Sequence, residues 1–555
     1  MMKNKIYQIC ALGLGVLALS SCKDYLDKLP DDRTELNQSN KISQLLVDAY
    51  PTVTNNLPHE MLSDNVDDNG RGYTSPIICE NYYKLVDPNE EGHDTPYDIW
   101  EGFYHSVAVV NETIKGINDM GNPDELRGYL AEAKLIRAFS MFQLAQTFCM
   151  AWDPTKAEEY QGLPYPTEPE QNINTTYTRG TLRQLYEAID KDIEEALPYI
   201  SEVNDLFAAP KYHFNTKAAY AFATRFNLYY MKWDKAIKYA NMVLGADPKQ
   251  VMRNYDPYRD LGRTDFANLW IRSNDQANLF LLPTYSISCR YLTWATSDRY
   301  AHNNTMASYE TYWVDGPWGS GSNANSIIYA NKLYGTNQCV AFPSYEEQFE
   351  YTDKVASIGY VHAVDPVFTG DITILERAEA YALTGQFELA VADINTWIGT
   401  HCKDKVEGGT VVGPAPAPQT LADINAFITG MDYAKRTPDG WRDRSMRKRM
   451  HPQGFTVQSG SMENLLQLIL HMKRIETVFH GIRFCDVKRY GIEYTHDVRF
   501  EDPVIFIRGD YRGAVQIPNT VIAAGMDANP RMEKEEIDAI VAATEAEYLT
   551  DDEDE

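Results

Sequence analysis

After its N-terminal segment, the sequence lacks any apolar run long enough to cross a membrane. A spanning helix needs about 20 mostly apolar residues, and residues 23–555 contain no run of that kind. Positive charge is also in deficit, since 51 Lys and Arg residues stand against 79 Asp and Glu residues, for a formal net charge of −28. So acidic a chain is repelled by phosphate backbones and anionic lipids, which disfavours binding to nucleic acid or adsorption to an anionic membrane surface.

Cysteine is scarce and dispersed, with eight residues in the chain and no CxxC pair. Cys10 and Cys22 lie in the N-terminal segment. Because the other six are far apart, we expect them to behave as small buried apolar residues rather than as disulfide partners or zinc ligands. These six are Cys79, Cys149, Cys289, Cys339, Cys402 and Cys485.

Catalytic and cofactor motifs are missing, and the near matches fail at a decisive position. His59 and Glu60 begin an HExxH zinc motif, but Ser63 occupies the place of the second histidine. Residues 64–70 offer several oxygen ligands to calcium, yet the acidic residue that closes an EF-hand is absent, so a solvated loop fits better. The sequence therefore predicts no catalytic residues, no metal site and no cofactor.

The N-terminal segment is the most informative part of the sequence that is present. Lys3 and Lys5 precede an apolar run over residues 6–19, and Cys22 follows two serines. This order is typical of a secretory signal that ends in a lipobox. We expect residues 1–21 to be removed and Cys22 to carry lipid, including palmitate, because two acyl chains suffice for stable anchoring. The alternative is an ordinary signal peptide, or a buried helix, with a chance cysteine.

Helical periodicity dominates the body of the chain. Apolar residues recur at helical spacing over 131–148 and 461–480, and Gly481 stands where the second of these helices should end. Short apolar runs at 279–282 and 504–507 predict strands. The predicted fold class is therefore mainly α, with a few short strands.

An internal echo, that is, a short sequence pattern that occurs twice in the chain, indicates paired helices. The segment WDKAIKY at 233–239 matches FELAVAD at 387–393 in its aromatic residue, its alanine and its β-branched residue. This spacing lets a second helix pack closely against the preceding one, as in tetratricopeptide repeats. We expect such helix pairs within about 127–245 and 372–400, although two unrelated helical hairpins would give a similar pattern.

The most promising binding segment is an aromatic loop at residues 291–318. Seven of its 28 residues are Tyr or Trp, where an overall aromatic content of 12% predicts three or four. Sugars stack their apolar CH faces on such rings and need amide partners for their hydroxyls, so we predict a glycan site here. A core-packing role for individual rings is the alternative. The candidate residues are Tyr291, Trp294, Tyr300, Tyr309, Tyr312, Trp313 and Trp318, together with Asn303 and Asn304.

Several motifs, taken in their order along the chain, resemble the SusD/RagB family of outer-membrane lipoproteins from Bacteroidetes. They are SCKDYLD at 21–27, DIWEGFY at 98–104, AKLIRAF at 133–139, RAEAY at 377–381, GIRFCDVKRYG at 481–491, QIP at 516–518 and NP at 529–530. The 481–491 motif is the most specific. Position 485 has a cysteine where the family usually has a tryptophan. This difference affects the local packing and does not change the resemblance to the family.

This resemblance implies a cell-surface protein of nutrient uptake that captures oligosaccharide and delivers it to a SusC-like TonB-dependent transporter. It also implies a lipid anchor in the outer membrane, with the protein facing the cell exterior. The family motifs would then belong to the scaffold, including Trp100, Trp233 and Arg483. Peptide capture, as in the RagB branch, is the alternative, and a lipid-anchored glycoside hydrolase is a more distant one.

The resemblance further implies a single SusD-like body over residues 22–555. In addition to the helix pairs, its expected parts are loop-rich ligand-binding insertions at about 246–371 and 401–460, and a C-terminal family region at about 461–531. Residues 532–555 are strongly acidic and are expected to form a solvated tail, with a short helix around 537–546.

The lipobox generates the first prediction. Because acylation needs the Cys22 thiol, Cys22→Ala should abolish labelling of the protein by palmitate and release most of it from the outer membrane. Metabolic labelling and membrane fractionation measure both effects. Palmitate labelling of the variant at the wild-type level would contradict the lipobox.

Overall fold

The computed structural model describes residues 38–170, 177–293, 299–319, 327–407 and 410–549. Helices account for most of its regular structure, and most of the strands are short. The predicted mainly α fold class is therefore confirmed. Within the described ranges, no helix is both long and apolar enough to span a membrane.

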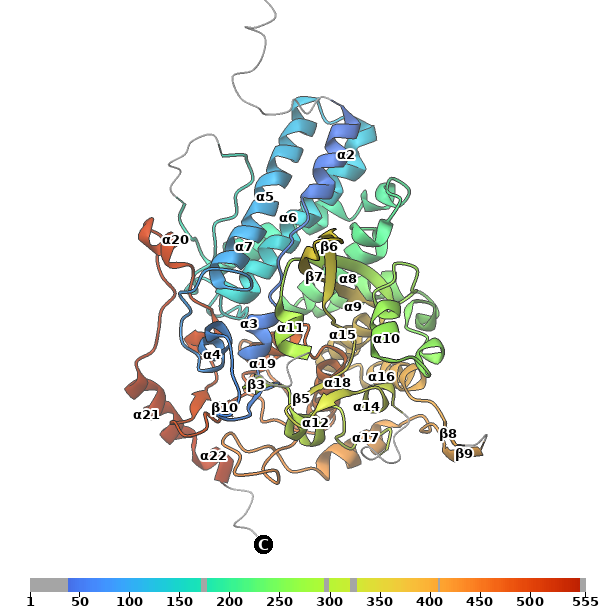
Figure 1. The fold of residues 1–555 in the computed structure, drawn as a ribbon, viewed down its shortest axis with the longest axis vertical. Coiled ribbons are helices and arrows are strands. Elements are labelled where there is room, and N and C mark those ends of the chain that lie inside the picture. The colour runs from blue at the N-terminus through green and yellow to red at the C-terminus, as the bar shows by residue number, and fades with distance from the viewer. Residues whose placement is uncertain (1–37, 171–176, 294–298, 320–326, 408–409, 550–555) are drawn as a thin grey trace, which may run out of the picture.

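Four helices form the elongated upper part of the molecule in Figure 1. They are α2 (Ser39–Asp48), α5 (Pro96–Asp119), α6 (Arg127–Phe148) and α7 (Leu182–Ala196). α6 packs against both α5 and α7, and it is buried nearly all round because its apolar residues are not confined to one stripe. Thr95 caps α5 by accepting a hydrogen bond from the Asp98 amide, and Thr181 with Gln184 forms a capping box on α7.

Both echo segments begin the second helix of a helix pair. α8 (Thr216–Tyr229) pairs with α9 (Trp233–Leu244), and α15 (Gly370–Leu383) pairs with α16 (Phe387–His401). Ala236 and Ala390 are fully buried, which allows the close approach that the motif predicts. α9 also packs against α15, so the two pairs are neighbours in space although a long insertion separates them in sequence.

The C-terminal family region contributes two consecutive helices. α18 (Ser461–Glu476) packs across α15 and α16, and α19 (Ile482–Tyr490) follows it after a short connection. Gly481 precedes α19 with a φ of 69°, a conformation that favours glycine. A Cβ at this position would lie 3.2 Å from the Cα of Asn56 and from the Cβ of His59. The helix predicted over 461–480 therefore ends earlier, and Gly481 marks the turn between two helices.

The largest sheet has the antiparallel strand order β2-β7-β6. Its strands are β2 (Asn278–Thr284), β6 (Gln348–Asp353) and β7 (Ile358–Thr369). The other strands form antiparallel pairs: β1 (Asp67–Asp68) with β3 (Tyr300–Ala301), β4 (Tyr334–Thr336) with β5 (Cys339–Ala341), β8 (Lys405–Glu407) with β9 (Thr410–Gly413), and β10 (Tyr494–His496) with β11 (Val504–Phe506). The two predicted strands coincide with β2 and β11.

Shorter helices fill the remaining segments. The α-helices are α3 (Asn56–Met61), α4 (Ile77–Tyr83), α10 (Arg263–Trp270), α11 (Ser288–Thr293), α12 (Asn304–Tyr309), α14 (Ile328–Asn331), α17 (Leu421–Thr429), α20 (Asn519–Ala523), α21 (Lys534–Thr544) and α22 (Ala546–Leu549). Single 3₁₀ turns lie at Asp124–Leu126, Ile200–Val203, Pro210–Tyr212, Pro248–Val251, Asp256–Tyr258 and Tyr511–Gly513. Most of these elements lie in the two insertions or near the chain ends.

The acidic tail begins with the expected short helix, and its last residues lie outside the described part of the chain. α21 and α22 extend through it to Leu549. The buried guanidinium of Arg436 donates hydrogen bonds to the Thr544 hydroxyl at 2.7 Å and to the Val541 carbonyl at 3.1 Å. It also pairs with Glu545 at 3.0 Å, so a single arginine holds the end of α21 against the body.

The six cysteines beyond the N-terminal segment are buried, and none of them forms a disulfide in the described structure. Their predicted behaviour as small apolar residues is confirmed. Cys22 lies outside the described residues.

Candidate ligand-binding surface

The structure divides the rings of the aromatic loop into buried and accessible ones. Tyr300, Tyr312 and Trp318 are 0%, 2% and 4% exposed. Tyr300 stacks on Tyr83, and Trp318 stacks on His471. The core-packing alternative therefore holds for these three rings, which have no free face for a ligand.

The other predicted residues lie nearer the surface. Tyr291, Tyr309 and Trp313 are half-buried, whereas Trp294 lies outside the described residues. Asn303 caps α12 by accepting hydrogen bonds from two backbone amides at 3.0 and 3.1 Å, so its side-chain oxygen is committed to the fold. Asn304 begins α12 and is half-buried, and its role as a ligand contact stays a prediction.

Trp441 is the accessible ring that sequence reasoning missed. Its side chain is 51% exposed and stacks on Tyr309, with ring centroids 5.4 Å apart and planes inclined by 24°. The guanidinium of Arg442 lies over the indole, 4.5 Å from the ring centroid. The pair joins the two insertions predicted to carry ligand. The sequence signal that could have identified Trp441 was a single tryptophan directly after the turn-forming residues Pro438-Asp439-Gly440.

Arg444 fixes the position of this aromatic pair. One guanidinium nitrogen of Arg444 lies 3.0 Å from Asp67, and another lies 3.0 Å from Glu310. Glu310 follows Tyr309 directly, and Arg444 is three residues after Trp441. The same ion pairs therefore hold both stacked rings and tie them to β1.

Glu310 belongs to a larger cluster of buried charges. It accepts from Lys448 at 2.6 Å and from Arg474 at 3.1 Å, and Asp64 pairs with Arg483 at 2.7 Å. Burial by itself would raise the pKa of Glu310, but the cations Lys448, Arg474 and Arg444 outweigh it and lower that pKa to about 2. The cluster therefore stays ionised at neutral pH, and its carboxylates are held as anions by fixed cations.

The segment at residues 64–73 lies beside the aromatic loop, because β1 pairs with β3. Asp67 pairs with Arg444, and Asp68 pairs with Arg299 at 2.7 Å, so both carboxylates are neutralised by arginines rather than left free for calcium. Arg71, at the tip of the segment, lies over the 79% exposed ring of Phe500, 5.3 Å from its centroid. The segment therefore also carries a second exposed cation that contacts an exposed ring.

A polar depression of only about 20 Å³ lies beside Glu310 and Arg444, the residues that hold the stacked pair. Asp67, Glu310, Asp443, Arg444 and Lys435 are among the residues that line it. These groups offer hydrogen-bond donors and acceptors beside an apolar ring face, which is the combination that a sugar needs. We call Tyr309, Trp441 and Arg442, with this depression, the aromatic surface.

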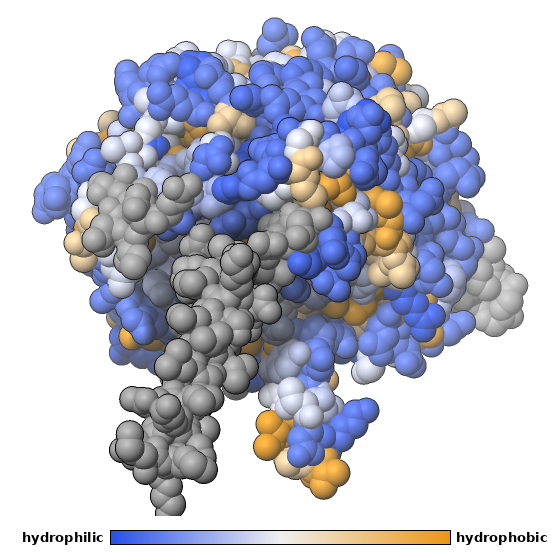
Figure 2. Space-filling view, turned by 90° about the horizontal axis from the view of Figure 1, so that it is seen from above, coloured by the Kyte–Doolittle hydropathy of each residue, from blue (hydrophilic) through white to orange (hydrophobic). Residues whose placement is uncertain are grey.

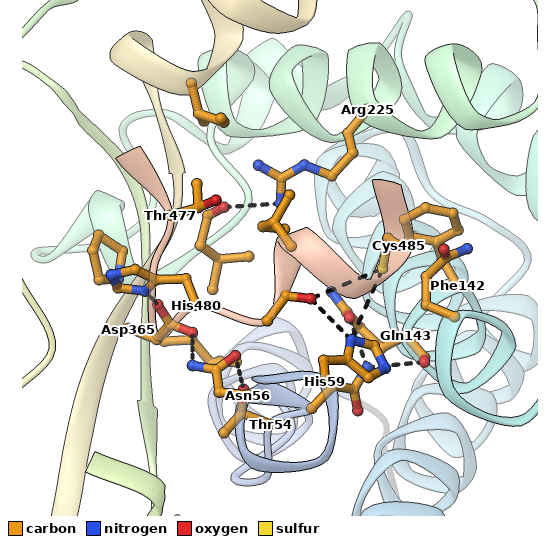
Figure 3. A pocket seen from close by; sticks show the side chains of 18 of the residues that line it. Thr54, Asn56, His59, Phe142, Gln143, Arg225, Asp365, Thr477, His480 and Cys485 are labelled. Atoms are coloured by element: carbon orange, nitrogen blue, oxygen red, sulfur yellow. Dashed lines mark hydrogen bonds and ion pairs between the residues drawn. The ribbon is translucent and has the colours of Figure 1, made fainter. Parts of the chain in front are cut away.

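A cavity lies inside the molecule, where Figure 3 shows its lining side chains. Its volume is about 70 Å³, which is far below the size of ordinary ligand pockets. Asp365 accepts a hydrogen bond from Asn56 at 2.9 Å and contacts His480 at 2.8 Å. Burial and the nearby Lys488 lower the pKa of His59 to about 3, so its ring is neutral. This cavity is too small and too enclosed to hold an oligosaccharide.

The comparisons with known proteins agree with this architecture. Residues 24–228 match the family model described as "Starch-binding associating with outer membrane", of the SusD-like type. A SusD superfamily protein from Bacteroides vulgatus is 17% identical, with a TM-score of 0.57, over 90% of this chain and 100% of its own. A SusD superfamily protein from Bacteroides thetaiotaomicron is 16% identical, with a TM-score of 0.54, over 90% and 100%. No curated protein matches the chain.

Residues 24–228 are therefore similar to the SusD-like family, and the chain has the fold of SusD superfamily proteins. A laminarin-binding SusD-like protein also has this fold, at 15% identity and a TM-score of 0.51, over 89% of this chain and 99% of its own. The family is associated with the outer membrane.

The motifs that resemble the SusD/RagB family serve the scaffold in the structure. Arg483 is buried against Asp64, Trp100 packs on Tyr104 and Phe148, and Trp233 packs on Phe455. Cys485 is buried and lines the internal cavity. A small side chain at the family's usual tryptophan position therefore adjoins unfilled space.

The loop before α12 generates a prediction about pH. His302 is buried, its Nδ1 lies 2.8 Å from the Val340 carbonyl, and its Nε2 lies 2.8 Å from the Thr311 hydroxyl. Burial lowers the pKa of His302 to about 4, so the folded ring stays neutral while the unfolded ring takes up a proton below about pH 6.5. His302 should therefore reduce stability as pH falls from about 6.5 to 4, by about 1.4 kcal/mol per unit.

His302→Gln keeps a donor and an acceptor but cannot titrate in this range. Thermal unfolding of both proteins between pH 7 and pH 4.5 should show the wild-type midpoint falling relative to that of the variant. Parallel curves for the two proteins would contradict a buried neutral His302.

Proposed function

We propose that this protein is a cell-surface glycan-binding lipoprotein, which captures oligosaccharide on the aromatic surface and delivers it to a SusC-like TonB-dependent transporter. The observation that carries the proposal is the exposed, stacked pair of Tyr309 and Trp441, held by ion pairs from Arg444. The family description and the laminarin-binding structural neighbour support the same ligand class.

Binding on this surface needs no chemical step. The exposed face of Trp441 offers an apolar plane for the CH face of a pyranose, and Arg442 supplies donors beside it. The carboxylate of Asp443 and the ammonium of Lys435 form an ion pair at 3.2 Å at the edge of the neighbouring depression. Sugar hydroxyls can exchange hydrogen bonds with such groups, so we propose a binding protein and not an enzyme.

The position of the aromatic surface suits a tethered receptor. α2, the first described helix, lies at the top of Figure 1, and α12 lies near the bottom. A lipid on Cys22 would join the protein to the outer membrane through the segment before α2. The aromatic surface would then lie at the end of the molecule away from the tether, where a glycan from outside the cell can reach it.

The third prediction tests the aromatic surface. Trp441→Ala removes the exposed half of the stacked pair and should weaken binding to a recognised glycan at least tenfold, or about 1.4 kcal/mol, because truncated aromatic anchors commonly cost that much. Affinity electrophoresis or calorimetry against a panel of polysaccharides that includes laminarin and starch gives the measurement.

Tyr351→Ala is the matched control, because Tyr351 is 50% exposed and lies on β6, away from α12. It should bind glycan as the wild type does. Trp313→Ala and Trp294→Ala extend the test to Trp313, which is half-buried, and to Trp294, which lies outside the described residues. Equal binding by wild type and Trp441→Ala would place the glycan elsewhere, and binding of mixed oligopeptides without any glycan would favour the peptide-binding alternative.

The fourth prediction concerns the transporter. A receptor that delivers its ligand to a membrane transporter must form a lasting contact with that transporter, which requires a large interface. Affinity purification of the tagged protein from detergent-solubilised outer membranes of its native host should therefore recover a TonB-dependent transporter, identified by mass spectrometry. Recovery of no such transporter would contradict the partnership and leave the glycan test unaffected.

A further inference from the structure

Three buried ligand-type groups meet where the second helix pair contacts the C-terminal region. Asp371 lies in the first turn of α15, His401 is the last residue of α16, and Glu476 is the last residue of α18. His401 Nε2 lies 3.2 Å from Glu476 Oε2 and 3.8 Å from Asp371 Oδ1. Asp371 and His401 are fully buried, and Glu476 is 8% exposed. Within the described residues, one ligand atom from each of these side chains lies within 4.8 Å of the other two.

The tautomer of His401 follows from its other ring nitrogen. Nδ1 lies 2.8 Å from the carbonyl oxygen of Trp397, which can only accept a hydrogen bond. Nδ1 therefore carries the proton, and in the neutral ring the lone pair of Nε2 faces the two carboxylates. This is an arrangement of three acceptors turned toward one another, which is unfavourable unless a cation lies between them.

A proton alone fits this arrangement poorly. Although Nε2 and Glu476 Oε2 are 3.2 Å apart, Nε2 forms no hydrogen bond within the described structure, so the oxygen lies off the direction of a ring N–H. Asp371 Oδ2 is likewise buried without a hydrogen-bond partner there. The nearby guanidinium of Arg253 is committed to Asp275 at 2.9 Å and leaves both carboxylates of the cluster without an arginine partner.

A small divalent cation fits better. Ligand atoms bound at about 2.0–2.2 Å from one ion, at angles near 90–110°, lie about 3.0–3.5 Å apart. His401 Nε2 and Glu476 Oε2 are already at 3.2 Å, and Asp371 Oδ1, at 3.8 Å from Nε2, would move closer on binding an ion. The nitrogen donor argues against calcium, which prefers six to eight oxygen ligands at longer distances. One imidazole with two carboxylates suits zinc or manganese.

The surrounding groups orient the three ligands as in known metal sites. The Nδ1 proton of His401 is directed at a backbone carbonyl, which fixes the ring and its tautomer. The indole N–H of Trp397 donates to Glu476 Oε2 at 3.0 Å, and the amide of Arg253 donates to Asp371 Oδ1 at 3.1 Å. The ring of Trp397 also stacks on His401 at 4.0 Å. These contacts hold the donor atoms in place before any ion arrives.

We propose that Asp371, His401 and Glu476 form a structural site for one small divalent transition-metal ion, with zinc the best fit, which joins α15 and α16 to α18. Glu476 also lines the internal cavity of about 70 Å³, which has room for a water molecule to complete the coordination. The ion would neutralise two buried carboxylates and link three helices in the core of the molecule.

The test is the metal content of the full chain. Because the site is buried, the protein is produced in medium supplemented with zinc, dialysed exhaustively and analysed by inductively coupled plasma mass spectrometry. We expect about one zinc ion per chain in the wild type. Unfolding in the presence of a chelator and refolding without metal should remove the ion and lower the thermal midpoint by about 5 °C or more, and refolding with zinc should restore it.

His401→Asn and Glu476→Gln should each lose the bound zinc. His471→Asn is the matched control, because His471 is also buried, on α18, and neither of its ring nitrogens is hydrogen-bonded in the described structure, yet it lies outside the cluster. This variant should retain the metal. If a variant fails to fold, the wild-type stoichiometry decides by itself.

Two results would overturn the proposal. One is a wild-type protein that carries less than about a tenth of an equivalent of zinc or manganese and refolds equally well with and without them. The other is a folded His401→Asn variant that retains as much metal as the wild type. Either result would mean that protons alone balance the charge of the cluster.

Discussion

The aromatic surface depends on a buried cluster of charges that joins four distant parts of the chain. Asp64 follows α3, Glu310 follows α12, Lys448 lies before α18, and Arg474 lies on α18. Removing one member of such a cluster leaves an uncompensated charge in the interior, which commonly costs about 3–5 kcal/mol. The ion pairs of the cluster therefore fix the relative positions of these segments. Tyr309 and Trp441 are held in place by the same cluster. Tyr309 directly precedes Glu310, and Trp441 is close in sequence to Arg444, which forms an ion pair with Glu310.

The same region holds a second buried cluster with a purely structural role. Glu379 on α15 accepts from Lys473 on α18 at 2.7 Å and from Arg489 on α19 at 2.8 Å. The neighbouring carboxylate of Asp486 pairs with both cations at 2.9 Å. Asp486 and Arg489 belong to the 481–491 motif and Glu379 belongs to the 377–381 motif, which explains why these motifs mark the fold and not the ligand. With the proposed metal site nearby, polar interactions and not apolar packing alone join α15 to the C-terminal helices.

The outer face is chemically different from this interior. Figure 2 shows one end of the molecule as mostly hydrophilic, with hydrophobic residues confined to small patches and a narrow projection. Single exposed apolar residues are normal on protein surfaces, so exposure by itself does not indicate a binding role. Trp441 is 51% exposed and is nevertheless held in a fixed stack, so its exposure is maintained by the fold and is not a result of loose packing. A preformed platform of this kind loses little freedom when a sugar binds.

The sequence by itself determined the features that depend on local pattern. Helical periodicity predicted α6 and α18, the echo located the starts of α9 and α16, and the turn at Gly481 followed from glycine's access to positive φ. The aromatic loop was found by composition, but composition does not state which face of a ring is covered. Tyr300, Tyr312 and Trp318 became core residues because distant segments pack on them.

Only the tertiary structure decided which rings and which charged groups meet. Trp441 lies 132 residues beyond Tyr309 in sequence, and no periodic pattern connects the two. The same holds for Asp371, His401 and Glu476, which come from three helices and share no motif spacing. Local sequence patterns depend on the conformation of neighbouring residues. A site assembled by long-range packing depends instead on how separate elements pack together. That packing is set by the burial of apolar faces and the pairing of buried charges.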